Sequence, residues 1–158
     1  MTQNTLPKYS HSFNIRVYGI CVINNHLLLS DETFKDQKIT KFPGGGLEYG
    51  EGTLDCLRRE FMEEFNLPIE IEGHFYTTDF FQKALYFENT QLISIYYKIR
   101  LPKTIKIPIS INVLPTDHTT AQRLRLVPLN TVDPKTLTFP IDQKVAEKLI
   151  QIFRSHQE

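Results

Sequence analysis

Apolar and polar residues alternate along much of the chain, and this alternation predicts a set of β-strands. The segment FNIRVYGICVI, residues 13–23, alternates at its start and then becomes continuously apolar, as in a strand that enters a core. The polar run Asn24-Asn25-His26 is a turn signal, and residues 27–30 then predict a returning strand. Three more segments have strand composition: residues 69–81, 91–101 and 123–129.

A helical repeat begins at Thr53, which is a suitable N-cap residue. The apolar residues that follow share one helical stripe: Leu54, Leu57, Phe61 and Phe65. Asn66 is expected to end this helix, because asparagine tolerates the left-handed conformation that follows many helices. The predicted helix therefore has one apolar face that can pack against the core.

A second helix is expected over residues 140–156, close to the C-terminus. Asp142 is the expected cap, and Val145, Leu149 and Ile152 are the residues expected to face inward. Strands on both sides of a first helix, followed by a terminal helix, indicate a single α/β domain with a mixed sheet. We expect residues 1–158 to form this one domain, with residues 1–11 as a flexible N-terminal segment.

Two stretches between these elements predict no regular structure. Residues 30–38 are polar and are expected to form a loop. The segment ITKFPGGGLEYGEG, residues 39–52, contains Pro43 and a run of glycines that disfavour a helix or strand for much of its length.

Composition limits the classes of function. The 158 residues include 18 basic and 18 acidic side chains, so the chain lacks the overall positive field of a non-specific nucleic-acid-binding protein. No uncharged apolar run approaches the roughly 18 residues of a membrane span, and the N-terminus lacks the apolar core of a signal peptide. Cys21 and Cys56 are too few for a disulfide framework, which favours a reducing cytoplasm.

The sequence RREFMEEFNLP concentrates negative charge on the first predicted helix. Glu60 lies three and four residues before Glu63 and Glu64, so the three carboxylates are neighbours on the helix surface. Like charges at this spacing destabilise a helix by roughly 0.2–0.5 kcal/mol per pair, and no Lys or Arg lies four residues C-terminal to any of them. Either water screens the repulsion or a cation binds there. Hard divalent cations such as Mg²⁺ prefer such oxygen ligands.

The glutamates belong to a longer motif that begins in the glycine-rich segment. Gly45 is followed after five residues by Glu51, and after seven more by the run Arg59-Glu60-Phe61-Met62-Glu63-Glu64. The segment from Gly45 to Leu67 resembles the Nudix box, G-x5-E-x7-R-E-U-x-E-E-x-G-U, in which U is a bulky apolar residue. Eight of nine specified positions match. The exception is Asn66 in place of glycine, a change that should alter only the helix cap.

The resemblance implies the fold and chemistry of a Nudix hydrolase, with an α/β/α sandwich and Mg²⁺ as the cofactor, or Mn²⁺ as an alternative. It assigns the metal-binding role to the carbonyl of Gly44 and to the carboxylates of Glu60, Glu63 and Glu64. Arg59 would orient Glu60, while Gly45 and Glu51 would support the site. Cys56 lies on the same side of the helix, where a space-filling role is favoured over a thiolate ligand.

The nucleophile would be a water molecule, and the nearest candidates for its general base are Glu60 and Glu63. Many members of the family carry a further glutamate before the last strand. Here that neighbourhood holds Gln122 and Arg123, and the nearest acid is Asp117. The identity of the base therefore remains open.

Three residues are candidates for substrate contacts. Arg16 leaves the first strand and could reach a phosphate, although it could equally face solvent. Phe80 and Tyr86 belong to an aromatic group that could stack on a nucleobase, with packing in the core as the alternative. The sequence thus does not specify the substrate.

Two functions remain. The first is hydrolysis of a diphosphate bond in a nucleoside diphosphate linked to another moiety, with a small nucleotide rather than nucleic acid as the substrate. The second is a Nudix-fold module that binds a nucleotide without turnover, which the missing glutamate favours.

One further segment bears on assembly. TIKIPISINVL, residues 104–114, places isoleucines on one face, and Pro108 restricts it to a sheet edge. We expect this region to form a homodimer interface. The alternative is a segment that folds back over its own sheet.

Overall fold

A computed structural model describes residues 11–105 and 122–156 of the chain. Its elements, in order, are β1 (Ser12–Ile23), β2 (His26–Phe34), β3 (Gln37–Lys41), β4 (Gly44–Gly46), α1 (Thr53–Phe65), β5 (Glu70–Thr77), β6 (Thr90–Arg100), β7 (Arg123–Pro128), the short 3-10 helix η1 (Pro134–Thr136) and α2 (Pro140–Ser155). None of the helices in these described ranges is long and apolar enough to cross a bilayer. Most of the 104–114 segment and nearly all of residues 1–11 lie outside the described ranges, so neither the dimer surface nor the flexible N-terminal segment is tested.

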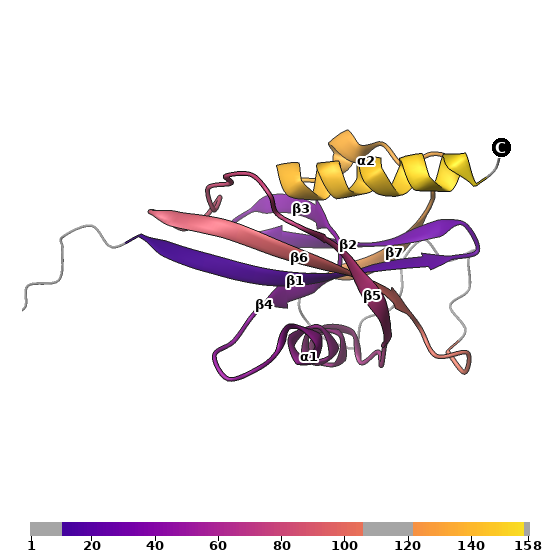
Figure 1. The fold of residues 1–158 in the computed structure, drawn as a ribbon, viewed down its shortest axis with the longest axis horizontal. Helices are drawn as coiled ribbons and strands as arrows, with labels where there is room; N and C mark the ends of the chain where they lie inside the picture. Colours follow the sequence, from indigo (N-terminus) through magenta and orange to yellow (C-terminus); the bar gives the residue numbers. More distant parts are fainter. Residues whose placement is uncertain (1–10, 106–121, 157–158) are drawn as a thin grey trace, which may run out of the picture.

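The sheet is mixed and organised around β1. Strand β6 pairs with β1 in parallel, β4 pairs with it antiparallel, and β5 extends the sheet beyond β6. Strand β2 pairs with β1 only next to their common turn, and then carries β3 on one side and β7 on the other. Figure 1 shows α1 on one face of this sheet and α2 on the opposite face, which confirms the α/β/α sandwich.

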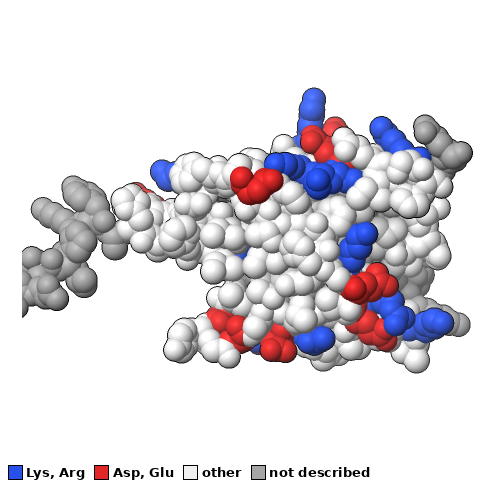
Figure 2. All heavy atoms as spheres, in the orientation of Figure 1, with Lys and Arg blue, Asp and Glu red and all other residues white. Residues whose placement is uncertain are grey.

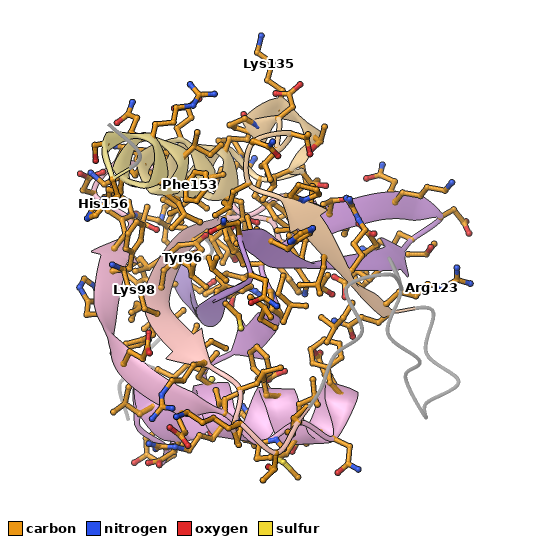
Figure 3. The ribbon with its side chains drawn as sticks, turned by 90° about the vertical axis from the view of Figure 1, so that its right-hand side faces the viewer. Tyr96, Lys98, Arg123, Lys135, Phe153 and His156 are labelled. Atoms are coloured by element: carbon orange, nitrogen blue, oxygen red, sulfur yellow. The ribbon has the colours of Figure 1, made fainter. Side chains whose placement is uncertain are left out.

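Alternation along β1 supplies both cores. Val17 packs with the buried residues of α1, whereas Tyr18 faces the opposite layer with Tyr96 and α2. Tyr18 and Tyr96 stack with their ring centroids 5.3 Å apart, and Tyr96 lies in the interior below α2 (Figure 3). Each helix is therefore held by one set of alternating strand residues.

Helix α1 forms largely as its periodicity predicts. Leu57, Phe61 and Phe65 are buried. Leu54, which is expected on the same stripe, lies in the first turn and is 38% exposed. The N-cap is Gly52 rather than Thr53, one residue earlier than expected.

The predicted end of α1 is confirmed. Asn66 adopts a left-handed conformation with φ of 51°; its N–H donates to the carbonyl of Met62, and the N–H of Leu67 donates to the carbonyl of Phe61. Asparagine thus supplies the cap geometry that glycine provides in the family pattern.

The expectation of irregular structure over residues 30–52 is wrong in two places. Strand β2 continues to Phe34, and β3 returns after a two-residue turn in which Lys35 and Asp36 both have positive φ. The glycines form β4, in which Gly45 pairs with Val17. The polar end of β2, the start of β3 and the glycine strand β4 are held by pairing with other strands, so their own composition does not predict them.

Helix α2 begins at Pro140, and its cap is Phe139 rather than Asp142. Asp142 instead points into the core, where its Oδ1 accepts a hydrogen bond from the Tyr96 hydroxyl. Val145 and Leu149 are buried as expected, but Ile152 is 39% exposed. The helix is thus rotated so that an acid, and not only apolar residues, faces the sheet.

Candidate active site

Arg59 is the centre of an ion-pair network on α1. Its Nε donates to Glu51 Oε2 at 2.9 Å and its Nη2 to Glu51 Oε1 at 2.6 Å. Its Nη1 contacts Glu60 Oε1 at 2.9 Å and Glu63 Oε2 at 3.1 Å. The planar guanidinium therefore relieves much of the repulsion among the glutamates. The compensating cation, Arg59, lies before the glutamates in the sequence and not four residues after them, so the spacing rule for C-terminal partners does not reveal it.

Glu51 ties the loop before α1 to this network. It accepts hydrogen bonds from Arg59 and, at 2.8 Å, from the backbone N–H of Glu48. The hydrogen bonds from Arg59 lower the pKa of Glu51 to about 2. Glu51 thus lies where a supporting role requires it, joining the loop to the helix.

Gly45 provides space for Glu60. A Cβ atom at this position would overlap the carboxylate of Glu60, so any side chain here would displace it. The preceding Gly44 has φ of +144°, a conformation that favours glycine, and a Cβ there would overlap the backbone of Val17. The glycine pair therefore brings β4 close to α1 at the residues of the box.

Glu64 lies apart from the Arg59 network. Gln122, just before β7, donates from Nε2 to Glu64 Oε2 at 3.0 Å and to Ser30 Oγ at 3.1 Å. Burial raises the pKa of Glu64 to about 7, and the neighbouring Glu60 adds to the shift, while Lys41 opposes it. An amide thus contacts Glu64 from the region where many family members carry an acid.

The structure does not assemble the expected cluster of three metal-binding carboxylates. Among the described residues, no three His, Cys, Asp or Glu side chains converge closely enough to hold an ion. Glu60 and Glu63 turn toward Arg59, and Glu64 turns toward Gln122.

The donor chemistry nevertheless fits Mg²⁺. Carboxylate oxygens are the ligands that this ion prefers, and Glu60 and Glu64 are both half-buried. Burial and the charge of Glu60 both raise the pKa of Glu64. The positive charge of a bound divalent cation would lower this pKa and favour the ionised carboxylate. The roles of these residues, and of the Gly44 carbonyl, as ligands stay predictions.

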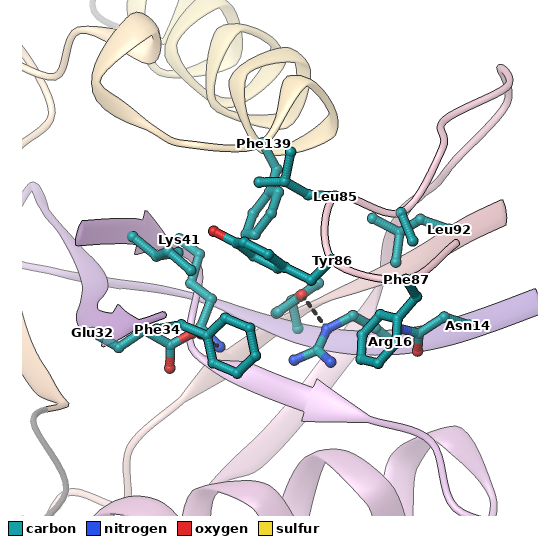
Figure 4. A pocket seen from close by; sticks show the side chains of 13 residues that line it. Asn14, Arg16, Glu32, Phe34, Lys41, Leu85, Tyr86, Phe87, Leu92 and Phe139 are labelled. Atoms are coloured by element: carbon teal, nitrogen blue, oxygen red, sulfur yellow. Dashed lines mark hydrogen bonds and ion pairs between the residues drawn. The ribbon is translucent and has the colours of Figure 1, made fainter. Parts of the chain in front are cut away.

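A pocket opens beside β4, between the ends of β1, β2 and β3 and the segment before β6. Its apolar wall consists of Phe34, Ile39, Ala84, Leu85, Tyr86, Phe87, Leu92 and Phe139. Its polar residues are Asn14, Arg16, Tyr18, Glu32 and Lys41. In Figure 4 the guanidinium of Arg16 lies among these residues, with Tyr86 and Phe34 nearby. Such a combination suits a ligand with one aromatic and one anionic part.

The structure separates the three substrate-contact candidates. Arg16 and Tyr86 both line the pocket. Phe80 does not line it, and its ring lies 4.9 Å from the Nζ of Lys144 on α2. The aromatic group is also not a core cluster, because Phe81 and Phe87 are 72% and 54% exposed.

Arg16 is oriented by its strand neighbour. Its Nε donates to the Tyr18 hydroxyl at 2.6 Å, as the dashed line in Figure 4 marks. This bond occupies one edge of the guanidinium and leaves Nη1 and Nη2 without a hydrogen bond or ion pair among the described residues. The planar group is therefore fixed at one edge and available for an anion at the other.

Strand β4 connects the pocket to α1. Gly46 pairs with Arg16, and a Cβ on Gly46 would lie 3.8 Å from Arg16 Nη1. The adjacent Gly45 accommodates Glu60. The anion-binding side of the pocket and the carboxylate of Glu60 thus lie on either side of β4. Figure 2 shows acidic side chains along the lower edge of the molecule, where α1 lies in Figure 1.

Three polar residues of the pocket are not indicated by the sequence pattern: Tyr18, Glu32 and Lys41. Lys41 is only 3% exposed, and its Nζ contacts Glu32 Oε1 at 3.1 Å. Both residues were assigned to irregular structure because β3 and the end of β2 were not recognised. In the hairpin, Lys41 pairs with Ser30 and Glu32 pairs with Ile39, so Glu32 and Lys41 are diagonal neighbours on one face.

Cys56 is buried, and burial raises the pKa of its thiol to about 12. The thiol donates to the Gly46 carbonyl at 3.4 Å. A protonated thiol of this kind fills space below β4, as expected, and is a poor metal ligand.

Comparison with known proteins identifies the family. The family model of the NUDIX domain matches residues 13–149 of the chain. The chain belongs to the Nudix family. The match spans the described sheet, both the box and the pocket, and most of α2, and it confirms the resemblance drawn from the sequence.

Solved structures share the fold. A Nudix hydrolase from Nitrosomonas europaea aligns over 85% of this chain and 86% of its own, with a TM-score of 0.65 and 15% identity. The MutT protein from Methanosarcina mazei Go1 aligns over 94% and 99%, with a TM-score of 0.66 and 14% identity. The E. coli ORF135 protein aligns over 94% and 96%, with a TM-score of 0.64 and 16% identity. No curated protein matched the sequence. The chain thus has the fold of Nudix hydrolases.

Proposed function

We propose that this Nudix protein is a divalent-metal-dependent hydrolase that cleaves a diphosphate bond in a nucleoside diphosphate linked to another moiety. The observation that carries the proposal is the position of the pocket. An aromatic wall and the free edge of Arg16 lie beside β4, and the same strand accommodates Glu60. A nucleotide in this pocket would extend its phosphates toward the box.

Mg²⁺ would be held by Glu60, Glu63 and Glu64, with the Gly44 carbonyl as a further ligand. When bound, the ion would neutralise charge on the diphosphate and lower the pKa of a water molecule. Arg59 would keep the carboxylate of Glu60 in place, and Glu51 would keep Arg59 in place.

The other residues of the site would bind and orient the substrate. Arg16 would contact a phosphate through Nη1 and Nη2, since its Nε is held by Tyr18. Tyr86 and Phe34 would contact the base, and their rings already lie 4.7 Å apart in an edge-on arrangement. Glu60 or Glu63 would accept the proton of the attacking water.

Gln122 favours a second candidate function, a module that binds a nucleotide without turning it over. Its amide contacts Glu64 where a third acid could otherwise serve as a base. An amide cannot accept a proton from water at neutral pH, so catalysis would depend entirely on the carboxylates of α1.

One assay separates the two candidates. Formation of the nucleoside monophosphate is measured by chromatography on nucleoside triphosphates, dinucleoside polyphosphates and nucleotide sugars, each with Mg²⁺, with Mn²⁺ and with EDTA. We expect turnover of at least one compound that EDTA abolishes. Binding of a nucleotide without turnover of any compound would exclude the hydrolase and support the binding module.

A further inference from the structure

Lys41 is a buried lysine that lines the pocket and has no part in the chemistry proposed above. It is the last residue of β3 and lines the pocket together with Arg16. Its side chain is 4% exposed, although it carries an ammonium group. Buried lysines are rare in proteins because removal of the charge from water is costly.

The compensation for this burial is incomplete. An ammonium group has three N–H donors, and the ion pair with Glu32 accounts for one of them. Glu32 itself is 24% exposed, so water shares its charge. Among the described residues, no other ion pair of Lys41 is found. A buried cation with spare donors, lining a pocket, is suited to an anionic ligand.

The position of Lys41 specifies which part of a ligand it would meet. In Figure 4 the side chains of Lys41 and Arg16 both extend toward the part of the pocket below Tyr86. Lys41 is also close enough to the box to oppose the raised pKa of Glu64. Lys41 therefore lies at the end of the pocket that faces the glutamates, away from Leu92 and Phe139.

We propose that Lys41 is a second anion-binding residue of this pocket: it contacts the phosphate group next to the one held by Arg16, and Glu32 positions its ammonium. The ligand class is a phosphoanhydride with two adjacent phosphoryl groups, and in this respect the inference rests on the proposed function. Two cations at one end of the pocket select for a diphosphate over a single phosphate.

Pyrophosphate is the simplest probe, and its binding is measured by calorimetry in EDTA on the full chain. Lys41→Met removes the charge and keeps the length of the side chain. We expect it to weaken pyrophosphate binding by about tenfold or more, the scale of a lost charge-assisted hydrogen bond. Lys38→Met, an exposed lysine on the same strand, is the matched control and should leave binding unchanged.

Glu32→Gln tests the positioning role. It leaves the ammonium in place but removes the charge that holds it, so we expect weaker pyrophosphate binding than in the wild type and stronger binding than in Lys41→Met. With a nucleotide that the protein hydrolyses, Lys41→Met should raise KM more than it lowers kcat. A pair that serves only stability would change the melting temperature and leave both KM and the pyrophosphate affinity unaltered.

If Lys41→Met does not fold, the double variant Glu32→Gln/Lys41→Met is used in its place, because it leaves no uncompensated buried charge. Its pyrophosphate affinity is then compared with that of Glu32→Gln. Equal affinities, or no pyrophosphate binding by the wild type, would overturn the inference. Lys41-dependent binding without hydrolysis of any compound would instead overturn the proposed function alone.

Discussion

Glu64 and Asp142 are acids on opposite faces of the same sheet, and burial raises the pKa of each to about 7. Their surroundings differ. The side chain of Asp142 on α2 is fully buried; the Tyr96 hydroxyl donates to one of its oxygens, and the other oxygen has no hydrogen-bond partner among the described residues. Glu64 is half-buried on α1, with Gln122 on one oxygen and the charge of Glu60 nearby.

The comparison shows that a raised pKa does not by itself mark an active site. Asp142 has a tyrosine partner and apolar neighbours, and burial raises its pKa against the opposing charges of Lys41 and Arg16. Glu64 shares its surroundings with a second acid, Glu60, whose charge adds to the effect of burial on its pKa. The buried Asp142 is stable as a neutral acid, whereas the unfavourable proximity of Glu60 and Glu64 can be relieved by a bound cation.

The largest expected effect comes from the glutamates of α1. Glu64→Gln and Glu60→Gln should each lower kcat by about 10²-fold or more, because each removes a charged oxygen from the ion. Thermal unfolding in metal-free buffer should show equal or higher stability for Glu64→Gln, because burial and Glu60 disfavour the charge of Glu64, whereas Glu60→Gln loses its ion pair with Arg59. Near-normal kcat at saturating Mg²⁺ in either variant would show that the metal assignment is wrong.

A smaller loss is expected when the space for Glu60 is filled. Gly45→Ala places a Cβ where the Glu60 carboxylate lies, so the carboxylate must move. We expect a decrease in kcat of about tenfold or more. Gly73→Ala is the control for a glycine in a strand, because a Cβ there has no neighbour within 4 Å. Equal activities of the two variants would show that the position of Glu60 is unimportant.

Glu51→Gln should act mainly through Arg59. It removes the carboxylate that accepts two hydrogen bonds from Arg59, the bonds that lower the pKa of Glu51 to about 2, and so weakens the hold on the guanidinium. We expect reduced stability at neutral pH and a loss of kcat smaller than that of Glu60→Gln. The folded-state pKa is depressed, so the stabilisation by Glu51 is present above pH 4.5 and disappears as the pH falls toward 2. Urea unfolding of both proteins across this range measures the difference.

Asp142→Asn should leave activity nearly unchanged and alter only the pH dependence of stability. The folded-state pKa is raised from 3.8 to about 7, so the folded protein binds the proton more tightly and loses stability as the pH rises through this range. The free energy of unfolding of the wild type, relative to Asp142→Asn, should fall by about 2 kcal/mol between pH 5 and pH 7. A constant difference would mean that Asp142 is not protonated at pH 5 in the folded protein.

Local sequence determined much of the fold and of the box. The spacing from Gly45 to Glu64 and the repeat of Leu57, Phe61 and Phe65 depend only on neighbours along the chain, and the structure contains both. Asn66 was expected as a cap for the same reason.

Features that depend on pairing across the sheet were not predictable in this way. The Lys41–Glu32 ion pair requires β3 to fold back on β2. Asp142 was misread as a cap because a short acid near a helix start suits that position, and only tertiary packing turns it toward Tyr96.

The central claim is that the carboxylates of α1 bind a divalent cation, and calorimetric titration of Mn²⁺ tests it without reference to any substrate. We predict that the wild type and Asp142→Asn bind Mn²⁺ with equal affinity, and that Glu64→Gln binds it at least about tenfold more weakly. Equal Mn²⁺ affinity of Glu64→Gln and the wild type, or no binding by the wild type, would contradict the account.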